Sequence, residues 1–141
     1  MKSWGNPDTA TCGTVAAINE VIVAYCRFVD LYEDVSMVAL FTNDGHWLRP
    51  GKEPLRGRDE IKAYLQTRDR SVRTRHIPSN VLVTVNDAES ATAVSCYTIM
   101  KSGPDGSPMP VTLGEYHDLF LLREGRWQIS RRDTRHVFRA I

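Results

Sequence analysis

The chain has 141 residues, close to the most common size of a single folded domain. Hydrophobic residues make up 42% of it and charged residues 25%, a balance that excludes an extensively disordered protein. The 18 lysines and arginines nearly match the 17 aspartates and glutamates, so the net charge is +1. Proteins that bind nucleic acid or anionic membranes usually have a larger basic excess, and we expect neither partner here. We predict a single domain over residues 1–141.

The cysteines and short motifs give no sign of a disulfide framework or a prosthetic group. Cys12, Cys26 and Cys96 are odd in number, far apart and lack a C-x-x-C pair. The sequence has no Gly-rich phosphate loop, nucleophile elbow or HExxH helix. We therefore expect no cofactor and no metal.

The first helix is predicted from the spacing of apolar residues near the N-terminus. These residues recur at intervals of three and four: Val15, Ile18, Ile22, Tyr25 and Val29. Such spacing is typical of an amphipathic helix, and Asp8 or Thr11 is expected to cap its start. Polar residues within the stretch argue against a membrane span, and the N-terminus lacks the order of a signal peptide. We expect a cytoplasmic protein.

Two shorter helices and a short strand are predicted next. The second helix is expected over Asp34–Phe41, followed by a turn at Asn43–Gly45 and a strand over His46–Arg49. A loop covers Pro50–Pro54. The third helix begins near Asp59, whose carboxylate suits the positive N-terminal end of a helix.

The last part of the chain has the alternating pattern of β-strands. We predict four long antiparallel strands, one around Val81 and the others over Thr92–Met100, Val111–Arg123 and Trp127–Val137. A loop rich in Gly and Pro, Ser102–Pro110, joins the second strand to the third. Helices followed by strands indicate the α+β class, with the helices on one face of a curved antiparallel sheet. Such an arrangement forms a cone with a pocket inside it.

Four segments carry a family resemblance, and together they cover most of the chain. They are V-D-L-Y-E-D-V-S-M-V-A-L-F-T-N-D-G-H-W (Val29–Trp47), G-R-D-E-I-K-A-Y-L (Gly57–Leu65), R-T-R-H-I-P-S-N-V (Arg73–Val81) and G-E-Y-H-D-L-F-L-L-R-E-G-R-W (Gly114–Trp127). In this order they resemble the SnoaL-like, nuclear-transport-factor-2-like (NTF2-like) superfamily. The resemblance implies a cone-shaped, cystatin-like α+β barrel in which three N-terminal helices enclose a pocket. The superfamily includes dehydratases, isomerases, cyclases, dioxygenase small subunits and binding modules, so the fold leaves the activity open.

Within this superfamily the chain resembles the group of scytalone dehydratase, hexachlorocyclohexane dehydrochlorinase and bile-acid dehydratase. The resemblance implies a catalytic aspartate at Asp30, a catalytic histidine at His76 and, as in some members, a catalytic tyrosine at Tyr25. Several members carry another polar catalytic residue on the strand after the histidine. That strand has no His or Asp here, and Tyr97 is the remaining candidate.

Each of these residues also has a structural interpretation. An imidazole exchanges protons near neutral pH, and a carboxylate on one ring nitrogen orients it and stabilises its protonated form. A phenol such as that of Tyr25 can donate to a substrate oxygen. Alternatively, Asp30 caps the second helix or faces solvent, His76 is structural or exposed, and Tyr25 packs in the core on the same stripe as Ile18.

Aromatic residues and arginines complete the set of candidates. Trp47, Tyr64, Tyr97 and Tyr116 are candidate substrate-binding walls, on which a flat, small, apolar organic ligand would stack. The arginines are interpreted as solvated faces or subunit contacts: Arg68, Arg70, Arg73, Arg75, Arg131, Arg132 and Arg135. Alternation along the last strand would turn Arg131 toward the mouth of the pocket.

Two functions from different classes fit these observations. The first is a cofactor-independent lyase or isomerase, dehydratase-like, that uses His-Asp general acid/base chemistry on a small apolar cyclic or polyketide-like substrate. The second is a non-catalytic binding or assembly module, similar to the small subunit of a ring-hydroxylating dioxygenase. Because the strands are apolar on both faces, we also expect a homodimer or homotrimer that covers the outer face of the sheet.

Overall fold

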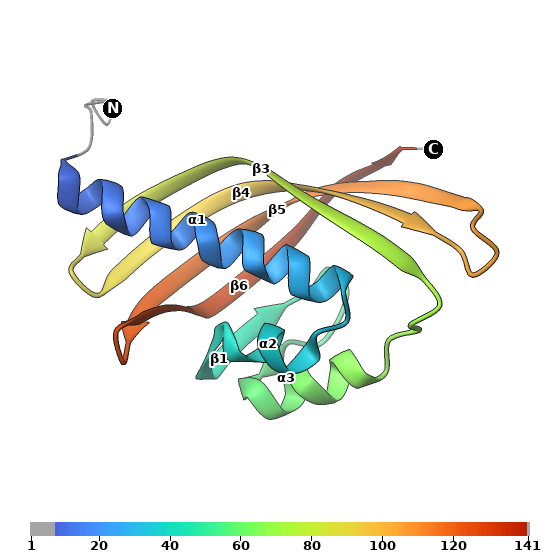
Figure 1. The fold of residues 1–141 in the computed structure, drawn as a ribbon, viewed down its shortest axis with the longest axis horizontal. Helices are drawn as coiled ribbons and strands as arrows, with labels where there is room; N and C mark the ends of the chain where they lie inside the picture. Colours follow the sequence, from blue (N-terminus) through green and yellow to red (C-terminus); the bar gives the residue numbers. More distant parts are fainter. Residues whose placement is uncertain (1–7, 141) are drawn as a thin grey trace.

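The computed structural model describes residues 8–140, in which three helices lie against a six-stranded sheet (Figure 1). The elements are α1 (Thr9–Asp30), α2 (Asp34–Ala39), β1 (Phe41–Leu48), β2 (Leu55–Arg56), α3 (Gly57–Gln66), β3 (Arg73–Asp87), β4 (Ser90–Ser102), β5 (Pro108–Arg123) and β6 (Arg126–Ala140). The strand order is β2-β1-β6-β5-β4-β3, and the sheet is curved but not closed. The predicted α+β class and curved antiparallel sheet are confirmed.

Helix α1 forms from the predicted apolar stripe. Its start is capped by the Asp8 carboxylate, which accepts a hydrogen bond from the Thr11 amide at 2.7 Å. Its buried residues face the sheet: Ile18, Ile22, Tyr25, Cys26 and Val29. By length and composition α1 would be able to cross a membrane, a test that the core helix of a soluble protein also passes. In this structure 28% of that apolar stretch is buried.

Strand β1 differs from the prediction of a turn followed by a short strand. It begins at Phe41, and the Asn43–Gly45 segment lies inside it. The strand runs parallel to β6, and its register shifts between Phe41 and His46. A Cβ atom on Gly45 would lie 3.1 Å from the carbonyl oxygen of Ile129, so the glycine permits a close approach to β6. The predicted second helix accordingly ends at Ala39 and does not reach Phe41.

The four long antiparallel strands are present and are longer than predicted. The turn between β3 and β4 lies at residues 88–89, after the Asn86-Asp87 pair. The loop between β4 and β5 is confined to residues 103–107, because Pro108 already pairs with Ser102. The hairpin of β4 and β5 extends beyond the end of α1 (Figure 1), so the helices cover only part of the sheet.

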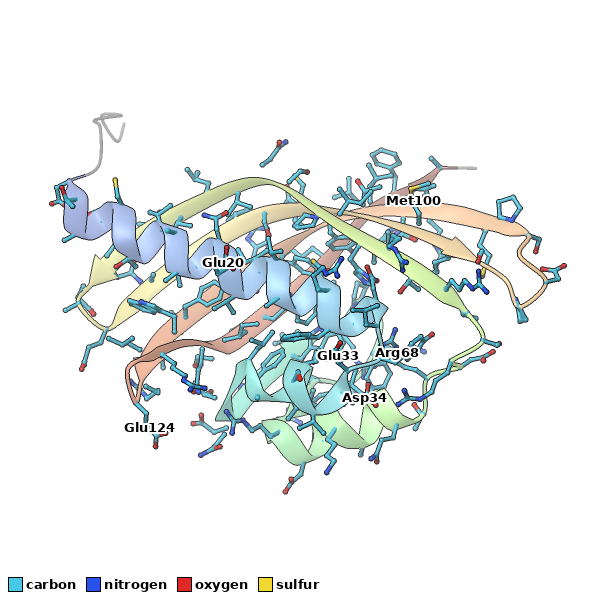
Figure 2. All side chains as sticks on the ribbon, viewed as in Figure 1. Glu20, Glu33, Asp34, Arg68, Met100 and Glu124 are labelled. Atoms are coloured by element: carbon cyan, nitrogen blue, oxygen red, sulfur yellow. The ribbon has the colours of Figure 1, made fainter. Side chains whose placement is uncertain are left out.

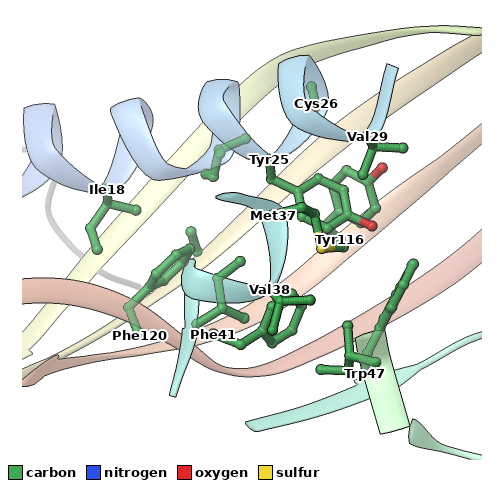
Figure 3. Packing of buried hydrophobic residues seen from close by; sticks show 14 of the residues in the cluster. Ile18, Tyr25, Cys26, Val29, Met37, Val38, Phe41, Trp47, Tyr116 and Phe120 are labelled. Carbon is green, nitrogen blue, oxygen red and sulfur yellow. The ribbon is translucent and has the colours of Figure 1, made fainter. Parts of the chain in front are cut away.

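The hydrophobic core lies between the helices and the inner face of the sheet. Figure 3 shows its aromatic centre, where Tyr25 of α1 lies among side chains from α2, β1 and β5. The Tyr25 ring contacts Phe41, Trp47 and Tyr116 in edge-to-face geometry, with centroid distances of 6.4, 6.0 and 5.7 Å. These contacts fix the position of α1 above β5.

We expect the Gly114→Ala substitution to destabilise the fold by about 1–3 kcal/mol, the usual cost of overpacking a core. A Cβ atom at this position would overlap the carbonyl oxygen of Arg135 and the phenol of Tyr97. The measurement is the free energy of unfolding in urea. The control is Gly13→Ala on the exposed side of α1, where a Cβ atom meets nothing within 4 Å. The control is expected to stabilise by about 0.5–1 kcal/mol, and equal effects at the two sites would contradict the prediction.

Candidate active site

The fold brings Asp30 and His76 into contact although they are 46 residues apart. Asp30 is the last residue of α1, and its Oδ1 atom lies 2.5 Å from Nδ1 of His76 on β3. Two further groups of β3 donate to the same carboxylate, the Thr74 hydroxyl at 2.7 Å and the His76 amide at 2.8 Å. The side chains of Asp30 and His76 are only 8% and 9% exposed. The carboxylate is therefore held by β3 and does not cap α2.

The charge state of Asp30 determines how His76 is oriented. Burial raises the pKa of Asp30, but the hydrogen bonds from His76 and Thr74 outweigh this effect, and the pKa lies below its usual value. A charged carboxylate at Nδ1 favours a proton on that nitrogen. Nε2 of the neutral ring then has a free lone pair, which is the arrangement that a general base requires.

We expect the Asp30→Asn variant to be less stable than the wild type by about 1–3 kcal/mol at pH 7, because it loses hydrogen bonds to a charged group. The pKa of Asp30 is lower in the folded than in the unfolded chain. Its contribution is therefore complete above the unfolded pKa, about 4, and is lost as the pH falls through the folded pKa. Urea unfolding at several pH values should show the difference between the two proteins shrinking below about pH 4. A difference that does not change with pH would contradict this assignment.

A cavity of about 420 Å³ lies beside the pair and has an aromatic lining. Tyr25, Trp47 and Tyr64 line it together with His76. Trp47 is held by a hydrogen bond from its Nε1 to the Thr134 hydroxyl at 3.1 Å, and it meets Tyr64 edge to face at 5.5 Å. The structure thus gathers five of the predicted site residues, Asp30 included, in one place.

Tyr97 and Tyr116 do not line this cavity. Tyr116 packs beneath Tyr25 in the core, and Tyr97 packs on Tyr116 with a centroid distance of 4.6 Å. The Tyr97 hydroxyl donates to the carbonyl oxygen of Arg135 at 3.2 Å. Both residues are 2% exposed. They lie on the inner face of the sheet, as do the cavity-lining Ile99 and Lys101, but at positions covered by Tyr25 of α1.

A buried ion pair beneath Tyr25 was missed by the sequence interpretation. Arg132 and Asp118 are paired through two hydrogen bonds, of 2.9 and 2.7 Å, and both side chains are fully buried. The Arg132 guanidinium lies between the rings of Tyr25 and Tyr116, at 3.9 and 4.0 Å from their centroids. Burial raises the pKa of the Tyr25 phenol, which keeps it protonated and able to donate.

The interpretation of the arginines as solvated is wrong for Arg132 and incomplete for Arg68. Arg132 is buried, whereas Arg131, the residue expected to turn inward, is exposed. Arg68 lines the cavity, while its neighbour Arg70 pairs with Asp34 at 2.7 Å outside it. The position of Asp118 could have been predicted from the sequence. It lies two residues from both Tyr116 and Phe120, so the alternation of β5 places all three on the inner face.

The sequence profile of the SnoaL-like domain matches residues 11–133. The chain belongs to the SnoaL-like domain family. Among solved structures, this SnoaL-like domain is similar to a scytalone dehydratase-like protein from Novosphingobium aromaticivorans, with 22% identity, a TM-score of 0.84, and coverage of 93% of this chain and 89% of that one. It is also similar to the hexachlorocyclohexane dehydrochlorinase LinA, with 15% identity, a TM-score of 0.84, and coverage of 95% and 92%.

A protein of unknown function from Mycobacterium tuberculosis is similar at 26% identity, with a TM-score of 0.78 and coverage of 88% of this chain and 76% of that one. No curated protein matches the sequence. Within residues 8–140, no group of three or more His, Cys, Asp and Glu side chains is placed to hold a metal ion. The similarities establish the fold and the family, and the chemistry has to be argued from the site.

Proposed function

We propose that this SnoaL-like domain is a cofactor-independent lyase or isomerase of the dehydratase type, acting on a small cyclic or polyketide-like substrate. The observation that carries the proposal is the position of His76. Its ring is held by the buried carboxylate of Asp30 and lines a cavity with aromatic walls. A surface or purely structural histidine has no need of this combination.

The proposed reaction begins with proton abstraction next to a carbonyl group. Nε2 of His76 takes the proton, the C–H electron pair forms an enolate, and Asp30 stabilises the resulting imidazolium. The Tyr25 hydroxyl donates to the enolate oxygen. In a dehydration the enolate then expels a hydroxyl group from the adjacent carbon, and the imidazolium returns the proton so that water leaves. In an isomerisation the proton returns to another carbon instead.

The structural neighbours support this class of chemistry at the level of the fold. Two of them are a scytalone dehydratase-like protein and a dehydrochlorinase, and both names describe elimination reactions. One observation favours the alternative of a binding module. The inner-face residues of β4 that line the cavity are Ile99 and Lys101, so this strand supplies no His or Asp to the cavity. The orientation of His76 toward the cavity favours the enzyme over the binding module.

The test is a panel of cyclic ketones with a β-hydroxyl group, incubated with the protein in deuterated water. Deuterium incorporation at the α-carbon reports proton abstraction, and loss of the hydroxyl group reports dehydration. We expect at least one member of the panel to exchange or dehydrate above the buffer rate. Ligands that bind tightly but never exchange would overturn the proposal in favour of the binding module.

We also propose that the domain assembles into a homodimer or homotrimer through the outer face of the sheet. Large apolar side chains are exposed there, including Ile77 at 48%, Val94 at 37% and Met100 at 51%. A stable interface buries about 800 Å² on each partner. We expect sedimentation at micromolar concentration to give a dimer or trimer, and Val94→Glu to shift it toward the monomer. A wild-type protein that sediments as a monomer would contradict the proposal.

A further inference from the structure

We infer that the substrate carries an anionic group, a carboxylate or a phosphate, which is bound at the open side of the cavity by Arg49 and Arg68. The inference rests on the proposed function only in placing the apolar body of the substrate beside His76. Exposed lining residues such as Pro50 and Lys101 mark the open side. The two arginines are half-buried at the same cavity.

Arg49 is fixed in place and has an unused donor. Its guanidinium lies 4.1 Å from the ring centroid of Tyr64 and 5.8 Å from that of Trp47, two walls of the cavity. Its Nη2 atom donates to the carbonyl oxygen of Glu53 at 3.2 Å. Its Nε atom is buried and has no hydrogen-bond partner among the described residues. Buried donors in proteins are nearly always paired, and no group of residues 8–140 satisfies this one. The Nη1 atom also has no hydrogen-bond partner among these residues, which leaves it available to an acceptor on a ligand.

Arg68 is fixed at the end of α1 (Figure 2), where its Nη1 atom donates to the carbonyl oxygen of Val29 at 3.1 Å. Its guanidinium stacks on Tyr32 with 4.5 Å between its central carbon and the ring centroid. That ring is itself anchored, because the Tyr32 hydroxyl bonds to the carbonyl oxygens of Asp69 and Val72 at 2.7 and 2.5 Å. A guanidinium held in this way loses little entropy when it binds an anion.

The charges that line the cavity are not balanced. Lys101 adds a third cation to Arg49 and Arg68, and no carboxylate of residues 8–140 forms an ion pair with any of them. Asp69 is the one acidic residue in the lining, and its Oδ1 atom accepts hydrogen bonds from the amide and hydroxyl of Ser71 at 2.9 and 2.6 Å. Asp30 is occupied by His76 and Thr74.

Flat aromatic walls beside fixed guanidinium groups indicate the class of substrate. The cavity of about 420 Å³ suits a molecule of one or two rings. The rings would lie against Trp47 and Tyr64, with the acid group directed toward the two arginines. An arginine fork binds a carboxylate or a phosphate through paired hydrogen bonds.

The test compares acids with their neutral counterparts in calorimetric binding measurements. The probes are naphthalene carboxylate with its methyl ester, and naphthyl phosphate with naphthol. We expect at least one acid to bind about tenfold more tightly than its neutral partner, and the acid that does so identifies the group. In the Arg49→Met/Arg68→Met variant this preference is expected to disappear while binding of the neutral probe is unchanged.

Arg70→Met is the matched control, because Arg70 also lies near Tyr32, at 5.2 Å, but does not line the cavity. It should retain the preference for the acid, and thermal unfolding checks that each variant is folded. Equal binding of acid and neutral probe to the wild type, or a preference that survives the double substitution, would overturn the inference. The binding measurements test this inference separately from the proposed function. If the proposed function is wrong, the ketone panel shows no deuterium exchange, whichever probe binds more tightly.

Discussion

Replacing His76 by glutamine is expected to lower the rate of proton abstraction by about a hundredfold to ten-thousandfold. The change removes the proposed base and keeps a polar side chain of similar size. The rate is measured as deuterium exchange or dehydration of the best substrate in the ketone panel. Asp30→Asn should also lower the rate, because an amide in this place no longer favours the tautomer with the proton on Nδ1.

The protein contains a matched control for this experiment. His117 also contacts a carboxylate, with 2.8 Å between its Nε2 atom and Oε2 of Glu115, but this pair is on the opposite face of β5 from Tyr116. His117→Gln is expected to leave the rate unchanged. Turnover that survives both His76→Gln and Asp30→Asn would exclude the pair from catalysis.

Replacing Asp118 by alanine is expected to destabilise the protein by about 3–5 kcal/mol. The substitution leaves the Arg132 guanidinium fully buried, between two aromatic rings and without its carboxylate. The measurement is the free energy of unfolding in urea. Asp133→Ala is the comparison, because its ion pair with Arg135 is exposed and is worth at most about 1 kcal/mol.

The double variant Asp118→Leu/Arg132→Met separates charge burial from packing. It removes both charges and keeps apolar volume, and it is expected to recover most of the stability lost in Asp118→Ala. This variant also keeps the prediction testable if Asp118→Ala does not fold. A double variant no more stable than Asp118→Ala would contradict the explanation by an unpaired charge.

The sequence alone was sufficient for the elements whose pattern is long and regular. The apolar stripe of α1 predicts both the helix and its buried face, because residues spaced by three and four positions lie on one side of an α-helix. The same holds for the alternation in β4 and β5. The prediction of a turn at Asn43–Gly45 was wrong, because residue types that favour turns also occur inside strands. Here Gly45 lies within β1 and allows this strand to approach β6 closely.

The site could be predicted only in part. The resemblance to a family suggested Asp30, His76 and Tyr25. The structure places His76 and Tyr25 at one cavity and Asp30 in contact with His76. Their catalytic roles stay predictions. No local pattern distinguishes Arg68, which lines the cavity, from Arg70, which does not, since both belong to the same basic run near Tyr32.

The sequence by itself determined the α+β class, the buried face of α1 and the alternating strands, because these depend on local periodicity. The tertiary structure decided which side chains meet. In β6, Ile129 faces the core, and simple alternation would turn Arg131 inward. A register shift leaves Ile129 opposite Phe120 and Arg131 opposite Leu119, so one extra residue enters β6 and Arg132 takes the inner position opposite Asp118. Pairing with β5 sets this bulge, and no property of residues 129–132 alone predicts it.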